Sequence, residues 1–124
     1  MVDLCALLSA ADLHSVLGGS WIEGHLTATG GYCFWGSGNV SSDQVVTAID
    51  ERSIEEIKSA TPNGVDMTVS GHAGYWVREE NFHIQTTFVD LGGQSLIVEL
   101  PISSSAADDQ ISAQELAEIA IGNI

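Results

Sequence analysis

The chain has 124 residues, of which 17 are acidic and only three are basic, so its formal net charge at pH 7 is −14. This length is typical of one domain, and we expect a single domain over residues 1–124, while a hydrophobic content of 44% excludes a disordered chain. The charge excludes nucleic acid and anionic membrane surfaces as favourable partners, because both would repel the protein.

The first 50 residues predict a helix followed by two or three strands. The Ser9 hydroxyl can accept a hydrogen bond at a helix start, and Gly18 and Gly19 supply a left-handed stop. Apolar and polar side chains then alternate, which predicts a strand over residues 21–28 with Ile22, Leu26 and Ala28 on one face. Further strands are expected over residues 32–35 and 45–49.

The rest of the chain predicts a short helix, antiparallel strands and a closing helix. Ser53 and Glu56 form a capping box, whose helix must end before Pro62. Gly92 and Gly93 indicate the turn of a hairpin. Strands are expected over residues 65–69, 73–78, 82–88 and 96–100.

A second capping box marks the expected start of the last helix. Ser112 and Glu115 have the same spacing as the first box, and a polar connection over residues 101–110 precedes them. The order of elements predicts an α+β fold, with a mostly antiparallel sheet and the N-terminal, middle and C-terminal helices packed on one face.

The two cysteines, Cys5 and Cys33, are 28 positions apart, which matches neither a redox pair nor a four-ligand zinc site. A disulfide between them would join the start of the first helix to a strand and would stabilise the fold by about 3–4 kcal/mol. The alternative is a pair of buried thiols in a cytosolic protein.

Histidines are the candidate ligands for a metal or for hydrolytic chemistry. His72 and His83 are expected on neighbouring strands, and His25 on the first strand could join them with nearby carboxylates. A metal site needs three or four ligands that converge, and isolated surface histidines are the simpler reading. Because no catalytic or cofactor motif is present, we expect no enzymatic activity, no cofactor and no metal.

A candidate binding surface is expected around Trp76, Arg78 and His83. If Tyr75 and Val77 face the core, strand alternation puts Trp76 and Arg78 on a polar face beside His83. An exposed tryptophan next to an arginine is typical of a binding anchor. The alternative is that Trp76 lies in the core.

Several short motifs resemble a known family. The segments Asp3–Asp12 (DLCALLSAAD), Leu17-Gly18 and Cys33-Phe34-Trp35 are similar to the small actinobacterial-type cell-envelope lipoproteins of unknown function, which carry an Asp-Pro-Cys-x-Leu-Leu stretch and a Cys-x-Trp strand. Leu4 stands where that family often has proline. The resemblance implies the Cys5–Cys33 bridge and export to the cell envelope, and it implies no enzymatic activity.

These observations favour a non-enzymatic, exported or cell-envelope module that binds a protein, glycan or lipid partner as a monomer or homodimer. One alternative is a metal-dependent or hydrolytic enzyme that uses His25, His72 or His83, and another is a structural accessory domain that self-associates. The first residues lack the basic start and apolar stretch of a signal peptide, so we expect any leader to be absent from this chain.

Overall fold

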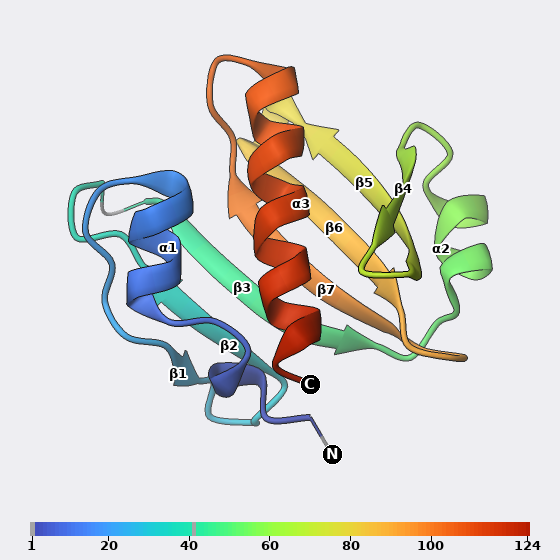
Figure 1. The fold of residues 1–124 in the computed structure, drawn as a ribbon, viewed down its shortest axis with the longest axis horizontal. Helices are drawn as coiled ribbons and strands as arrows, with labels where there is room; N and C mark the ends of the chain where they lie inside the picture. Colours follow the sequence, from blue (N-terminus) through green and yellow to red (C-terminus); the bar gives the residue numbers. More distant parts are fainter. Residues whose placement is uncertain (1, 41) are drawn as a thin grey trace.

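The computed structural model describes residues 2–40 and 42–124, and one antiparallel sheet takes up strands from both halves of the chain (Figure 1). The helical elements are η1 (Leu4–Ala6), α1 (Ala10–Leu17), α2 (Ile54–Ala60), η2 (Glu80–Phe82) and α3 (Ala106–Gly122). The strands are β1 (His25–Leu26), β2 (Tyr32–Gly36), β3 (Gln44–Asp50), β4 (Val65–Val69), β5 (His72–Glu79), β6 (Ile84–Asp90) and β7 (Ser95–Pro101). The expected α+β class is confirmed.

The strand order across the sheet is β1-β2-β3-β7-β6-β5-β4. Successive strands form hairpins on both sides, and β3 pairs with β7 in the middle, where Thr47 lies opposite Val98. The hairpin predicted with most local evidence is present: Asp90 pairs with Ser95, and Gly92 and Gly93 take positive φ angles of 86° and 97° between them. Glycine adopts these angles without a steric cost.

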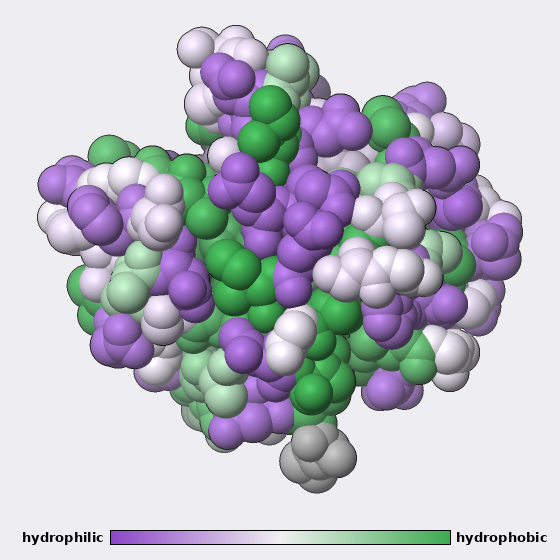
Figure 2. All heavy atoms as spheres, in the orientation of Figure 1, coloured by the Kyte–Doolittle hydropathy of each residue, from purple (hydrophilic) through white to green (hydrophobic). Residues whose placement is uncertain are grey.

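The main core lies between one face of the sheet, the inner face, and the helices α1 and α3. In Figure 1, α3 lies across the sheet, with α1 beside it over β2 and β3. The small side chains of Ala113, Ala117 and Ala120 are fully buried, which lets α3 approach the strands closely. Figure 2 shows this side of the molecule, with hydrophilic atoms along the exposed side of α3 and hydrophobic atoms between α3 and α1. The strand side chains of this core are Cys33, Trp35, Val45, Val69, Trp76, Val89, Leu96, Val98 and Leu100.

The middle helix packs on the opposite face of the sheet, the outer face, so the expectation that all three helices share one face is wrong. Ile54 and Ile57 of α2 are buried against Tyr75 and Val77 of β5. Trp76, between those two, points to the inner face, because successive side chains of a strand face opposite sides. Both faces of β5 are therefore covered.

Residues 21–28 do not form the long strand that their alternation predicts. Only His25 and Leu26 are in β1, and the apolar side chains of the segment are not buried: Ile22 is 60% exposed and Leu26 is 50% exposed. The reason is Gly24, whose backbone lies against the Trp35 indole so closely that an added Cβ would be 2.4 Å from the ring. Because the backbone of the segment packs against the core at this glycine, the alternation of side chains does not predict which of them are buried.

The last helix begins earlier than the second capping box predicts. Ser105 is its N-cap and accepts a hydrogen bond from the backbone N–H of Asp108 at 3.3 Å, whereas Ser112 lies inside the helix. The expected polar connection over residues 101–110 is thus partly helical. Ser53 does cap α2, and Ser9 caps α1, each with the reciprocal bond of a capping box.

Candidate functional site

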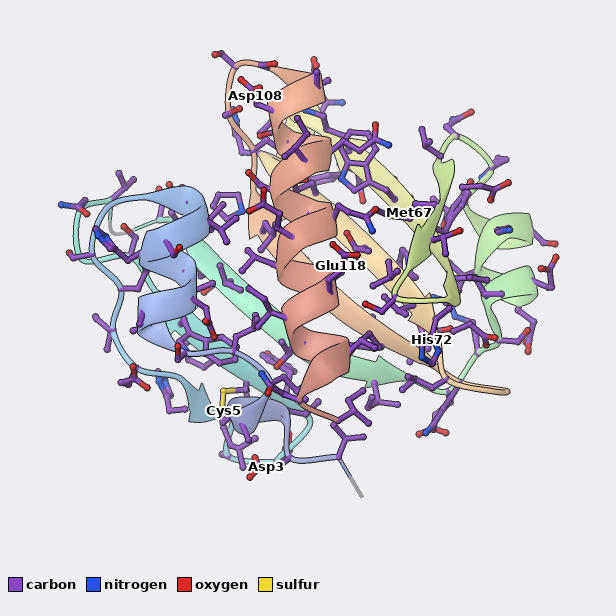
Figure 3. The ribbon with its side chains drawn as sticks, viewed as in Figure 1. Asp3, Cys5, Met67, His72, Asp108 and Glu118 are labelled. Carbon is purple, nitrogen blue, oxygen red and sulfur yellow. A yellow bond between two sulfur atoms is a disulfide. The ribbon has the colours of Figure 1, made fainter. Side chains whose placement is uncertain are left out.

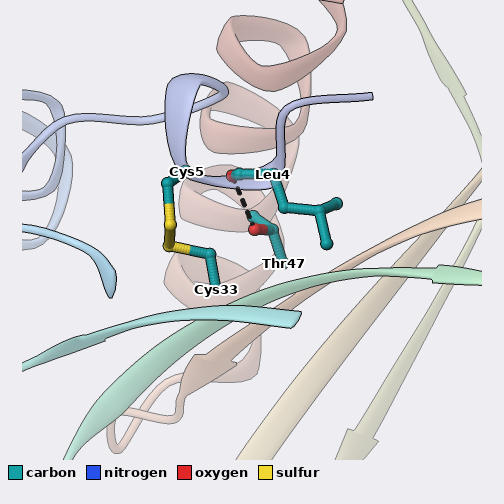
Figure 4. The surroundings of a disulfide bond; sticks show 4 residues. All are labelled: Leu4, Cys5, Cys33 and Thr47. Atoms are coloured by element: carbon teal, nitrogen blue, oxygen red, sulfur yellow. Dashed lines mark hydrogen bonds between the residues drawn. A yellow bond between two sulfur atoms is a disulfide. The ribbon is translucent and has the colours of Figure 1, made fainter. Parts of the chain in front are cut away.

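The disulfide between Cys5 and Cys33 is present, with a Cα–Cα distance of 5.3 Å. It joins η1 to the inner face of β2 (Figure 4). Next to it, the Thr47 hydroxyl donates to the carbonyl oxygen of Leu4 at 2.9 Å. A covalent bond and a buried hydrogen bond therefore hold the N-terminal turn on the sheet, which confirms the expected pairing.

Trp76 does not belong to an exposed binding surface. Its side chain is only 6% exposed, and its indole N–H donates to Gln85 Oε1 at 2.9 Å. The sequence-based alternative, that Trp76 lies in the core, is the correct one. The candidate surface of Trp76, Arg78 and His83 is therefore ruled out as an exposed aromatic anchor.

Arg78 serves as a clamp between β5 and the start of α3. Its Nε donates to Asp109 Oδ2 at 2.9 Å, and its terminal NH2 group donates to the Ser103 carbonyl at 2.8 Å. Asp109 is only 3% exposed and also accepts from the backbone N–H of Ser103 at 2.8 Å. Glu80 completes the ion pair from the solvent side. Because the Arg78 guanidinium is bound by Asp109, Ser103 and Glu80, its role is to stabilise the fold.

The three histidines considered as ligands are not brought together. His25 is on β1, whereas His72 and His83 lie near opposite ends of the β5–β6 hairpin, roughly 20 Å apart at the rise of a strand. The His72 ring bonds the Asp90 carbonyl at 3.0 Å, near one end of the sheet (Figure 3). Over residues 2–40 and 42–124, no group of three or more His, Cys, Asp and Glu side chains is arranged to hold a metal ion. No helix in the same residues has the length and apolar character of a membrane span.

The feature that stands out is the part of the outer sheet face that α2 leaves open. α2 contacts β5 and β6, whereas β1, β2, β3 and β7 present side chains on this face that are half-buried or exposed. We call this set the open face; its members are His25, Tyr32, Phe34, Val46, Ala48, Ile97 and Glu99.

Strand register arranges the open face in rows. One row runs from His25 to Phe34, Val46 and then Glu99, each opposite the next across a strand pair. The rings of His25 and Phe34 are in contact, with centroids 3.9 Å apart. A second row has Tyr32, which is 45% exposed, followed by Ala48 and Ile97. The result is a mostly apolar and aromatic surface built on the middle and one side of the sheet.

A hollow of about 550 Å³ lies at one end of the open face, and we call it the Glu99 hollow. Its lining includes Phe82, His83, Ile84, Glu99 and Ile102. Phe82 is 71% exposed at its rim, an unusual position for a phenylalanine.

Glu99 is a half-buried carboxylate on the central strand β7, with Val46 of β3 and Thr86 of β6 beside it. Burial, together with the Glu79 carboxylate, raises the pKa of Glu99 above its ordinary value. Because the folded pKa exceeds the unfolded one, ionisation of Glu99 costs stability; this cost is absent below the unfolded pKa and grows as the pH rises through the folded one.

The cations of the chain are all engaged away from Glu99. Arg52 pairs with Asp50 at 2.7 Å, Lys58 with Asp66 at 2.8 Å, and Arg78 with Asp109. These are the three basic residues of the sequence. Among the described residues, no salt bridge or side-chain hydrogen bond involves Glu99, so no lysine or arginine of the chain is paired with this carboxylate, and the His83 ring is the basic group that shares the hollow.

The sequence interpretation missed the open face, although a signal was present. Residues 96–100 read Leu-Ile-Val-Glu-Leu, so apolar side chains occupy both faces of this strand and a single glutamate interrupts one of them. A strand of this kind is expected to be covered on both sides.

Comparison of the chain with protein-family models, with curated proteins and with solved structures gives no match.

Proposed function

We propose that this protein is an exported, non-enzymatic binding module of the cell envelope, and that its open face docks a segment of a partner protein. The disulfide supports export, because such bonds persist in oxidising compartments outside the cytosol. The motifs around Cys5 and Cys33, which resemble those of small actinobacterial-type envelope lipoproteins, support the same location.

The observation that carries the proposal is the apolar character of the open face. Phe34, Val46 and Ile97 are neither fully buried nor covered by a helix, and they are continuous with the exposed Tyr32. An apolar surface of this kind, rimmed by polar groups, marks an interaction site. The broad face suits a protein segment that spans several strands, and the acidity of the chain favours a segment that carries basic residues.

The first test locates the partner. A photo-crosslinking phenylalanine analogue placed at Phe34 in the natively exported protein should give one adduct of discrete mass, identified by mass spectrometry. The same analogue at Ile111, which is 58% exposed on α3, is the matched control and should give none. Equal adducts at both positions, or none at Phe34, would contradict the proposal.

The second test measures affinity with the purified partner. Tyr32→Ala removes an exposed aromatic ring from the open face, so it should weaken binding at least about tenfold without unfolding the protein. Ile111→Ala should leave the affinity unchanged. Isothermal titration calorimetry distinguishes the two variants.

A further inference from the structure

We propose that the Glu99 hollow is a receptor for a basic side chain, an alkylammonium or guanidinium group, presented by the segment that docks on the open face. The identity of the carrier rests on the proposed function, whereas the recognition of the cation rests on the hollow itself. The juxtaposition that supports this inference is one carboxylate without a salt bridge, set in a hollow of about 550 Å³ whose lining combines apolar side chains with polar ones.

The hollow has room for an amphipathic side chain together with part of the segment that carries it. Ile84 and Ile102 provide apolar walls, and Phe82 adds an aromatic ring at the rim. Lysine and arginine bury the methylene stem against such surfaces while the charged head reaches a polar group. Glu99 supplies that group, and Gln44 adds a neutral amide to the lining.

The position of Glu99 in the sheet explains why no lysine or arginine of the chain pairs with it. β7 is a central strand, and Glu99 lies between Val46 of β3 and Thr86 of β6, neither of which carries a charge. The three basic side chains of the chain are held by Asp50, Asp66 and Asp109. A carboxylate that loses water beneath a docked partner is costly unless the partner brings a positive charge.

Charge also decides between the occupants that could cover this end of the open face. A second copy of the chain would bring the same carboxylate, and its own net charge of −14, to a surface that is already acidic. Asp43 lines the hollow as well, and Glu79 acts on Glu99 electrostatically, so the local potential is negative. A cationic segment is the complementary partner.

The test uses hexylammonium as the probe, with hexanol as its uncharged match. In a titration of the ¹⁵N-labelled protein at pH 7, hexylammonium should give saturable shifts confined to the amides of residues 82–86 and 97–102. Hexanol should bind at least about tenfold more weakly, because it has the apolar stem without the charge. Shifts of equal size with hexanol would overturn the proposal.

Two variants with the same change in charge make the test specific. Glu99→Gln should abolish the saturable shifts, whereas Glu118→Gln, at an exposed position on the opposite side of the sheet (Figure 3), should leave them intact. Glu99→Gln should melt no lower than the parent protein at pH 7, because it removes the cost of an ionised, half-buried carboxylate. Loss of binding in both variants would indicate a general attraction of cations to the acidic surface and would refute the hollow.

The two proposals can fail separately. A crosslinked partner whose affinity is unchanged by Glu99→Gln would keep the docking function and reject the cation receptor. Specific hexylammonium binding without any adduct at Phe34 would keep the receptor and reject the docking function.

Discussion

The three tryptophans show how one residue type takes different roles in this fold. Trp35 and Trp76 lie in the main core, where they are 0% and 6% exposed. Trp21 is partly exposed and donates its indole N–H to the Gly18 carbonyl at 2.9 Å. The residue with the greatest solvent access is thus Trp21. Around Trp76, strand alternation gives large apolar side chains on both faces, with Tyr75 and Val77 on one and Trp76 on the other. The pattern alone therefore does not predict which face packs against the core.

Replacement of single tryptophans should separate these environments. Trp76→Phe should remove a blue-shifted, acrylamide-protected component of the fluorescence and lower the free energy of unfolding by about 1–3 kcal/mol, because Gln85 Oε1 loses its donor in a buried site. Trp21→Phe should instead remove the quenchable, red-shifted component at a smaller cost in stability. A quenchable component that survives Trp21→Phe and disappears with Trp76→Phe would show that Trp76 is exposed.

At the scale of elements, the helix starts depend on hydrogen bonds that a few neighbouring residues make. Ser9 and Ser53 each satisfy the first free N–H groups of their helices, as their sequence spacing predicts. For α3, Ser112 and Glu115 have the spacing of a capping box, but the N-cap of the helix is Ser105. A helix that begins after Ser105 places Asp109 against Ser103 and against Arg78 of β5, and the long-range contact with Arg78 lies outside the capping pattern.

The cap of α3 can be tested with a matched pair of substitutions. Ser105→Ala should lower the free energy of unfolding by about 1 kcal/mol, because the N–H of Asp108 loses its acceptor. Ser112→Ala, within the helix, should be neutral or slightly stabilising, since alanine has the higher helix propensity. Urea denaturation measures both, and a larger loss for Ser112→Ala would contradict the observed start of the helix.

For the whole molecule, the charge imbalance sets the dominant long-range force. The few cations neutralise local carboxylates such as Asp50, Asp66 and Asp109, and the remaining acidic side chains repel one another. Compaction therefore has an electrostatic cost, which the disulfide and the inner core must offset.

Salt should relieve this repulsion. At pH 7, raising NaCl from about 10 to 300 mM shortens the screening length from roughly 30 Å to below 8 Å, so the melting temperature should rise by several degrees. The rise should be smaller at pH 4, where many carboxylates are protonated. A melting temperature that stays flat or falls with salt at pH 7, followed by circular dichroism, would show that repulsion does not limit stability.

What the sequence determined by itself is the set of features that depend on residues close to one another in the chain. The β6–β7 hairpin follows from Gly92 and Gly93, and the two helix starts at Ser9 and Ser53 follow from short-range caps. The disulfide could also be anticipated, because Cys5 and Cys33 are the two cysteines of the chain and their spacing matches neither a redox pair nor a four-ligand zinc site.

Only the tertiary structure decided which side of each strand is buried and by what. On β5 both Tyr75 and Trp76 are apolar, so their fate depends on where α2 and α3 pack, and that depends on connections far along the chain. The open face and the Glu99 hollow arise for the same reason, because α2 covers β5 and β6 and leaves β3 and β7 uncovered on that side. Periodicity tells the two faces of a strand apart, but the choice between them is made by packing, which is a property of the whole fold.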